Sequence, residues 1–101
     1  MKLVRNMIPV LYPQNEYHAV THRELTAMLR LKLIEEAGEV VGARNLAELT
    51  EELGDVLDVV SAIAGHAGIS AETIDSARDE KLNRLGGFEG GWVMTTYEEK
   101  R

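Results

Sequence analysis

Two long proline-free stretches dominate this sequence, and only Arg44 and Asn45 separate them. In Leu46–Ala67, apolar residues recur three or four positions apart, which is the spacing of one helix face. The stretch Thr21–Ala43 opens with Thr21 and Glu24, spaced as a capping box at the start of a helix. Asn45 is placed to cap the second helix. The pattern therefore predicts an all-α chain with two long neighbouring helices.

A third helix is predicted to follow Ser70 as its N-cap and to run to about Leu85, where Gly86 and Gly87 stop it. Both prolines of the chain lie in the first twenty residues, which predicts an irregular lead-in. The run Trp92–Tyr97 is β-branched and aromatic and predicts a short strand or extended arm. We expect an all-α helical bundle of three main helices between this lead-in and a short extended C-terminal arm.

The length of 101 residues corresponds to one domain, and we expect residues 1–101 to form it. A domain of this size buries little more than half of the surface that its unfolded chain exposes. Burial of the remaining apolar surface against a second copy would complete the bundle. The expected partner is therefore another copy of the chain, in a homodimer or a higher homo-oligomer.

Charge and composition narrow the possible functions. The 17 acidic and 11 basic residues give a net charge of -6, which argues against nucleic acid and anionic membranes as partners. The absence of cysteine excludes disulfides, thiolate metal sites and a cysteine nucleophile. No apolar run approaches the ~20 residues of a spanning helix, and the charged first residues do not resemble a signal peptide. A cytoplasmic location is the expectation.

Carboxylates interrupt the apolar faces of both long helices. At about 100° per residue, Glu36 falls inside the apolar stripe of the first helix, and Glu39 lies at the edge of that stripe. In the second helix, Glu52 points into the apolar arc, and Asp55 lies just past its edge. The apolar residues concerned are Leu25, Leu29, Leu33 and Val40 in the first helix and Leu49, Leu53, Val56, Leu57, Val59 and Ile63 in the second.

Carboxylates are rarely buried unless they are paired or bind a metal, and four of them converging would repel one another. A hard divalent cation removes the conflict, and Mg²⁺ prefers oxygen ligands. Zinc is disfavoured without cysteine or paired histidines, and a di-iron carboxylate site would need Glu-x-x-His motifs that the chain lacks. The alternative is an acidic, solvated helix face with no ion.

The acidic residues also form a recognisable motif. EEAGE at 35–39, followed after twelve residues by ELGD at 52–55, resembles the EExxE…ExxD signature of MazG-like all-α nucleotide pyrophosphohydrolases. KLVRNMIP at 2–9, KLIEE at 32–36 and KLNRLGGFE at 81–89 are similar to segments of its small phosphoribosyl-ATP pyrophosphohydrolase-like subgroup. Asn6 and Met7 depart from that pattern, which often has Asp and Lys there, and Leu85 separates Arg84 from the glycines.

The resemblance implies a Mg²⁺-dependent enzyme, with Mn²⁺ as a possible substitute, that cleaves the α–β phosphoanhydride of a nucleoside triphosphate. The products would be a nucleoside monophosphate and pyrophosphate. By motif position, Glu36, Glu39, Glu52 and Asp55 would be the metal ligands. Glu35 would be the catalytic residue, as a further ligand or as the group that activates the attacking water.

Three cations are candidates for binding the phosphates of the substrate, because charge-assisted hydrogen bonds to phosphate oxygens are strong. They are Lys32, Lys81 and Arg84. Each could instead pair with a nearby acid, and for Lys32 that acid would be Glu36, four residues later on the same helix.

Two other functions remain open at this point. One is phosphoribosyl-ATP pyrophosphohydrolase activity, which shares the chemistry and differs in the substrate. The other is a non-catalytic helical dimer that regulates a partner and uses the acidic cluster only as a structural metal site. Substrate cannot be fixed by analogy of fold.

Overall fold

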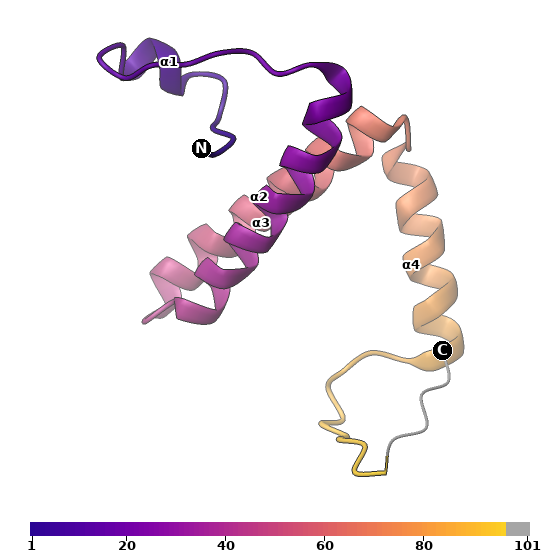
Figure 1. Ribbon diagram of the computed structural model, residues 1–101. Coiled ribbons are helices and arrows are strands. Elements are labelled where there is room, and N and C mark those ends of the chain that lie inside the picture. Colours follow the sequence, from indigo (N-terminus) through magenta and orange to yellow (C-terminus); the bar gives the residue numbers. More distant parts are fainter. Residues whose placement is uncertain (97–101) are drawn as a thin grey trace. The chain divides into compact units, whose positions relative to one another are not determined.

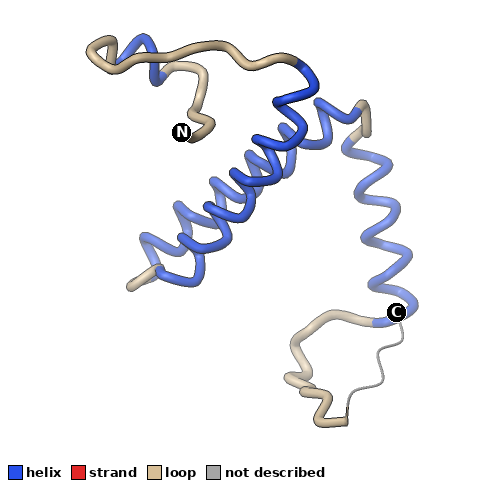
Figure 2. The backbone as a smooth tube through the Cα atoms, in the orientation of Figure 1, coloured by secondary structure: helices blue, strands red, loops and turns tan. Residues whose placement is uncertain are grey.

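The computed structural model describes residues 1–96, and the regular structure in this part of the chain is entirely helical (Figures 1 and 2). The helices are α1 (Ile8–Leu11), α2 (His22–Gly42), α3 (Leu46–Ala67) and α4 (Ala71–Leu85). The all-α prediction is confirmed.

Two local expectations need correction. The lead-in contains one helical turn, α1, because Pro9 lies in its first turn, where no backbone N–H is required. Of the two alternatives expected for the run at Trp92, a short strand or an extended arm, the strand is not found in the described residues, since residues 91–96 have no regular structure and Tyr97 lies outside the described range. No sheet is present in residues 1–96 for such a strand to join.

The two long helices begin and end where their capping residues predict. The side chain of Thr21 accepts a hydrogen bond from the N–H of Glu24, and the carboxylate of Glu24 accepts one from the N–H of Thr21, each 3.1 Å long. Asn45 Oδ1 accepts from the N–H of Glu48 at 2.9 Å to start α3. Gly68 ends α3 in the left-handed region, with φ of 74°, which glycine adopts at little cost.

Helices α2 and α3 run antiparallel and pack side by side as a hairpin (Figure 1). Its core is small: Leu29, Val59 and Ala64 are the buried apolar side chains among residues 1–96. Leu53 and Leu57, predicted to lie in the buried arc of α3, are instead 47% and 66% exposed. A single neighbouring helix covers only one side of α3, and this leaves the other side of the arc open.

The chain divides into two compact units, Met1–Ala71 and a second unit beginning at Glu72. The first contains α1 and the hairpin. The second contains nearly all of α4, whose side chains are exposed apart from the partly buried Ile74. Among the described helices, no single one is long and apolar enough to cross a membrane; α3 and α4 meet that test by length and composition only when taken together.

Candidate functional site

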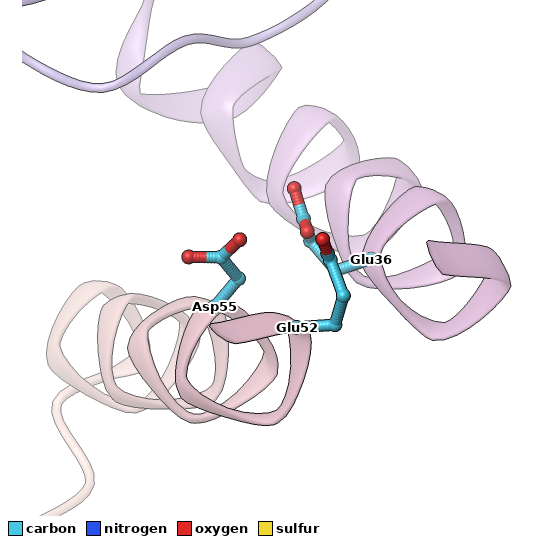
Figure 3. A group of neighbouring side chains, drawn as sticks. All are labelled: Glu36, Glu52 and Asp55. Atoms are coloured by element: carbon cyan, nitrogen blue, oxygen red, sulfur yellow. The ribbon is translucent and has the colours of Figure 1, made fainter. Parts of the chain in front are cut away.

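Three carboxylates from the two helices of the hairpin meet in one place (Figure 3). Glu36 comes from α2, and Glu52 and Asp55 come from α3. One carboxylate oxygen from each residue lies within 4.8 Å of the others. The i, i+3 spacing of Glu52 and Asp55 puts both on the same side of α3, one turn apart. We call these three residues the carboxylate cluster.

Glu36 is the buried polar residue among residues 1–96, with 8% of its surface exposed. Its position agrees with its place in the apolar stripe of α2. Lys32, one turn earlier on α2, places its Nζ 3.3 Å from Glu36 Oε1 and 3.4 Å from Glu35 Oε1. The Lys32 side chain is itself only 15% exposed, so this cation compensates a charge that little water reaches.

The α3 side of the cluster is compensated differently. Partial desolvation, together with the negative charges of Asp55, Glu39 and Glu36, raises the pKa of Glu52. Within residues 1–96, Glu52 makes no ion pair. The cluster therefore has an uncompensated negative charge at Glu52, where a cation would be stabilising.

A cation for the rest of α3 comes from the start of the chain. Arg5 donates from Nη2 to Asp55 Oδ1 at 2.7 Å and from Nη1 to Asp58 Oδ2 at 2.8 Å. Lys2 Nζ lies 3.4 Å from Glu35 Oε1. These hydrogen bonds raise the pKa of Arg5, which stays protonated. Residues 2–5 thus lie against the same side of the hairpin as the cluster.

Sequence reasoning missed Arg5, Lys2 and the pairing of Asp58. The pairings join residues 50 and 53 positions apart for Arg5 and 33 apart for Lys2, so no local periodicity reports them. The usable signal was the presence of two cations, three residues apart, in an irregular segment before an acidic hairpin.

The other predicted site residues lie around the cluster or on α4. Glu39 is exposed and is not one of the three grouped carboxylates. Glu35 is partly buried; although desolvation opposes the effect, the charge of Lys32 and hydrogen bonds from Lys2 and Lys32 lower its pKa. On α4, in the second unit, Arg84 Nε pairs with Glu80 Oε1 at 2.8 Å, and Lys81 is exposed.

The donor set of the cluster suits a hard divalent cation. It offers only carboxylate oxygens, close enough together to share one ion, and no sulfur or imidazole. Glu52 and Asp55 are partly exposed, so water and further oxygen ligands can reach an ion bound there. Mg²⁺ typically keeps several waters and binds through few protein carboxylates and the phosphates of a substrate.

Comparison with known proteins identifies one family. The model of the MazG nucleotide pyrophosphohydrolase domain matches residues 24–84, which include most of α2, all of α3 and most of α4. No curated protein and no solved structure matches the chain. The matched range includes every residue of the carboxylate cluster, whereas Lys2 and Arg5 precede it.

Proposed function

Since the chain belongs to the MazG nucleotide pyrophosphohydrolase family, we propose that it cleaves the α–β phosphoanhydride of nucleoside triphosphates in a Mg²⁺-dependent reaction. The products are a nucleoside monophosphate and pyrophosphate. The observation that carries the proposal is the meeting of Glu36, Glu52 and Asp55 on two helices inside the matched domain. Base and sugar preference stay open.

Glu36, Glu52 and Asp55 would hold the ion, and Glu39, one turn after Glu36, is the proposed fourth ligand. When bound, Mg²⁺ neutralises phosphate charge and lowers the pKa of a bound water. The buried Glu36 and its Lys32 neighbour give the site a fixed point, because both side chains are largely buried and lie 3.3 Å apart as an ion pair. Glu52 and Asp55 are more exposed than Glu36, and substrate would reach the ion from their side.

Glu35 is the proposed general base. Its carboxylate lies beside Glu36 and would accept a proton from the attacking water; because Lys32 and Lys2 lower its pKa and so weaken it as a base, that water would need to be made more acidic by the bound ion. The water oxygen bonds to one of the two phosphorus atoms of the α–β bridge, the bond from that phosphorus to the bridging oxygen breaks, and the monophosphate and pyrophosphate separate. Lys2 and Lys32 hold the Glu35 carboxylate between them, which positions it beside Glu36. Lys32, and Lys81 and Arg84 on α4, are the proposed phosphate contacts.

We further propose that the working form is a homodimer or a higher homo-oligomer. Each helix of the hairpin carries a second apolar stripe that nothing else in the first unit buries. Two such hairpins would complete a four-helix bundle. The exposed residues are Leu31, Ile34 and Val41 on α2 and Leu46, Leu53 and Leu57 on α3.

Sedimentation tests the assembly. The expected mass of the native protein is that of two or more chains, and Leu57→Glu should shift it toward the monomer because a charge would replace a buried contact. Glu51→Lys, at an exposed position about 120° around α3 from Leu57, is the control and should leave the mass unchanged. A native protein that sediments as a monomer at all concentrations would contradict the proposal.

The activity is tested by pyrophosphate release from a panel of ribo- and deoxyribonucleoside triphosphates and phosphoribosyl-ATP, with and without Mg²⁺. We expect release from triphosphates that depends on the metal. Preferred turnover of phosphoribosyl-ATP would assign the alternative substrate. Release of orthophosphate in place of pyrophosphate would contradict cleavage at the α–β bridge.

A further inference from the structure

A large hollow in the first unit lies between the N-terminal segment and the helical hairpin. Its volume is about 880 Å³, within the ~300–1,000 Å³ typical of small-molecule sites. One wall is formed by residues 2–15 and the other by parts of α2 and α3. Apolar side chains make up much of the lining, including Leu3, Val4, Ile8, Leu25, Leu29 and Val59.

This cavity reaches one residue of the carboxylate cluster, Glu36. Glu36 belongs both to the cluster and to the cavity lining, and Lys32 lines the cavity beside it. Asp58, which Arg5 binds together with the cluster residue Asp55, also lines the cavity. A molecule that fills the apolar part of the cavity therefore has one end at the proposed metal and phosphate site.

The N-terminal wall is held in place by the same charges. Arg5 bridges Asp55 and Asp58, and Lys2 contacts Glu35, so two cations fix residues 2–5 against the hairpin. Further along this wall, Tyr17 Oη donates a hydrogen bond to the carbonyl oxygen of Tyr12 at 2.8 Å. The wall is thus a built feature of the first unit, with its own contacts at both ends.

Polar and aromatic groups lie within the cavity lining away from the carboxylates. Tyr12, Asn15 and His66 contribute there. The His66 ring is fixed by a 2.8 Å hydrogen bond between its Nε2 and Thr26 Oγ1 and by stacking on His22, with ring centroids 4.0 Å apart. Flat rings and neutral amide groups are the groups that stack on a nucleobase and pair with its edges.

We propose that this cavity binds the nucleoside part of the substrate, base and sugar, and directs its phosphate chain past Glu36 to the carboxylate cluster. The inference deepens the proposed function and rests on it. Apolar walls suit the faces of the base, and the tyrosine, asparagine and histidine suit its edges. The N-terminal segment, which precedes the family match, then decides which base is accepted.

Gly65 offers a way to fill the cavity without disturbing the fold. It lines the cavity, and a Cβ built on it would meet no atom within 4 Å. It lies inside α3, where leucine is a better helix former than glycine. Gly65→Leu should therefore fold and occupy the space. Ala67→Leu is the matched control, because Ala67 is exposed, lies two residues later on the same helix and does not line the cavity.

The test compares two ligands in calorimetric titrations: nucleoside 5′-monophosphates without metal, and inorganic tripolyphosphate with Mg²⁺. The native protein and Ala67→Leu should bind at least one monophosphate. Gly65→Leu should weaken that binding about tenfold or more, since even one methylene group in a pocket changes affinity on that scale. Binding of tripolyphosphate should stay unchanged in both variants, because it needs only the carboxylate cluster and the neighbouring cations.

Two results would overturn the inference: no monophosphate bound by the native protein, or equal binding by Gly65→Leu and the native protein. Tyr12→Ala is a second variant at an exposed position of the opposite wall, and it should weaken the same monophosphates. Loss of monophosphate binding in Gly65→Leu supports the cavity even if no pyrophosphate is ever released. Conversely, if Gly65→Leu releases pyrophosphate at the native rate, the proposed function is supported, but the cavity is not where the nucleoside binds.

Discussion

The two halves of the carboxylate cluster handle their charge in different ways. On α2, Glu36 is buried and has Lys32 from its own helix 3.3 Å away. On α3, Asp55 depends on Arg5, fifty residues earlier in the chain. Glu52 makes no ion pair within residues 1–96, and desolvation together with neighbouring carboxylates raises its pKa. The α2 half is compensated by the helix itself, whereas the α3 half needs charge from outside. An added cation should therefore act mainly on α3.

Glu52→Gln should have the largest effect, because it removes the uncompensated charge on α3. Loss of a direct ligand should lower Mg²⁺-dependent turnover by about hundredfold or more, since even outer-shell partners of a metal cost up to that much. In metal-free buffer the same variant should melt at a higher temperature, because the raised pKa of Glu52 shows that its charge is disfavoured in the folded state.

Glu51→Gln is the control for Glu52→Gln, at the neighbouring exposed position of α3. It should leave turnover unchanged, and it should not raise the metal-free melting temperature as Glu52→Gln does. A Glu52→Gln protein that melts lower than the native protein without metal would show that the charge of Glu52 is already compensated.

Lys32→Met tests the charge compensation of Glu36 on α2. The substitution keeps an aliphatic side chain but leaves the buried Glu36 carboxylate without its cation. We expect a loss of about 1–3 kcal/mol in the free energy of unfolding in metal-free buffer, measured by urea denaturation. Saturating Mg²⁺ should reduce the loss. Arg30→Met, at an exposed position on the same helix, is the control and should change the free energy of unfolding little. If Lys32→Met lost the same stability with and without Mg²⁺, the account would be contradicted.

Arg5→Gln should have the smallest effect on stability. Its side chain is 58% exposed, and exposed pairs contribute less than about 1 kcal/mol, which salt screens further. Because Arg5 donates a hydrogen bond to Asp55, the loss of its guanidinium should free this carboxylate and tighten Mg²⁺ binding in the absence of nucleotide by up to about fivefold. Arg44→Gln is the control; it breaks the Arg44–Glu48 ion pair on the hairpin and should leave Mg²⁺ affinity unchanged. Weaker Mg²⁺ binding by Arg5→Gln would contradict the prediction and show that Arg5 organises the site.

Local rules predicted the helices of this chain well. The capping residues Thr21 and Asn45 and the left-handed Gly68 place the ends of α2 and α3 within a residue of expectation. Helical periodicity also placed Glu36 on the buried side of α2. These features depend on residues within a few positions of one another, and side-chain spacing reports them directly.

Tertiary and quaternary features were predicted less well. The contact of Arg5 with Asp55 depends on where an irregular segment packs, which no periodicity encodes. Leu53 and Leu57 belong to the apolar arc of α3 by spacing, yet they are exposed, because a hairpin covers one side of each helix. Periodicity indicates that a residue will be buried, but it does not say whether the same chain buries it.

The most direct test of the central claim is pyrophosphate release with and without Mg²⁺ by the native protein and by the double variant Glu36→Gln, Glu52→Gln, alongside their melting temperatures. We predict metal-dependent release by the native protein, a higher melting temperature with Mg²⁺, and neither response in the double variant. If no nucleotide releases pyrophosphate while Mg²⁺ still raises the melting temperature of the native protein, the carboxylate cluster binds an ion for structure alone, and the account is wrong.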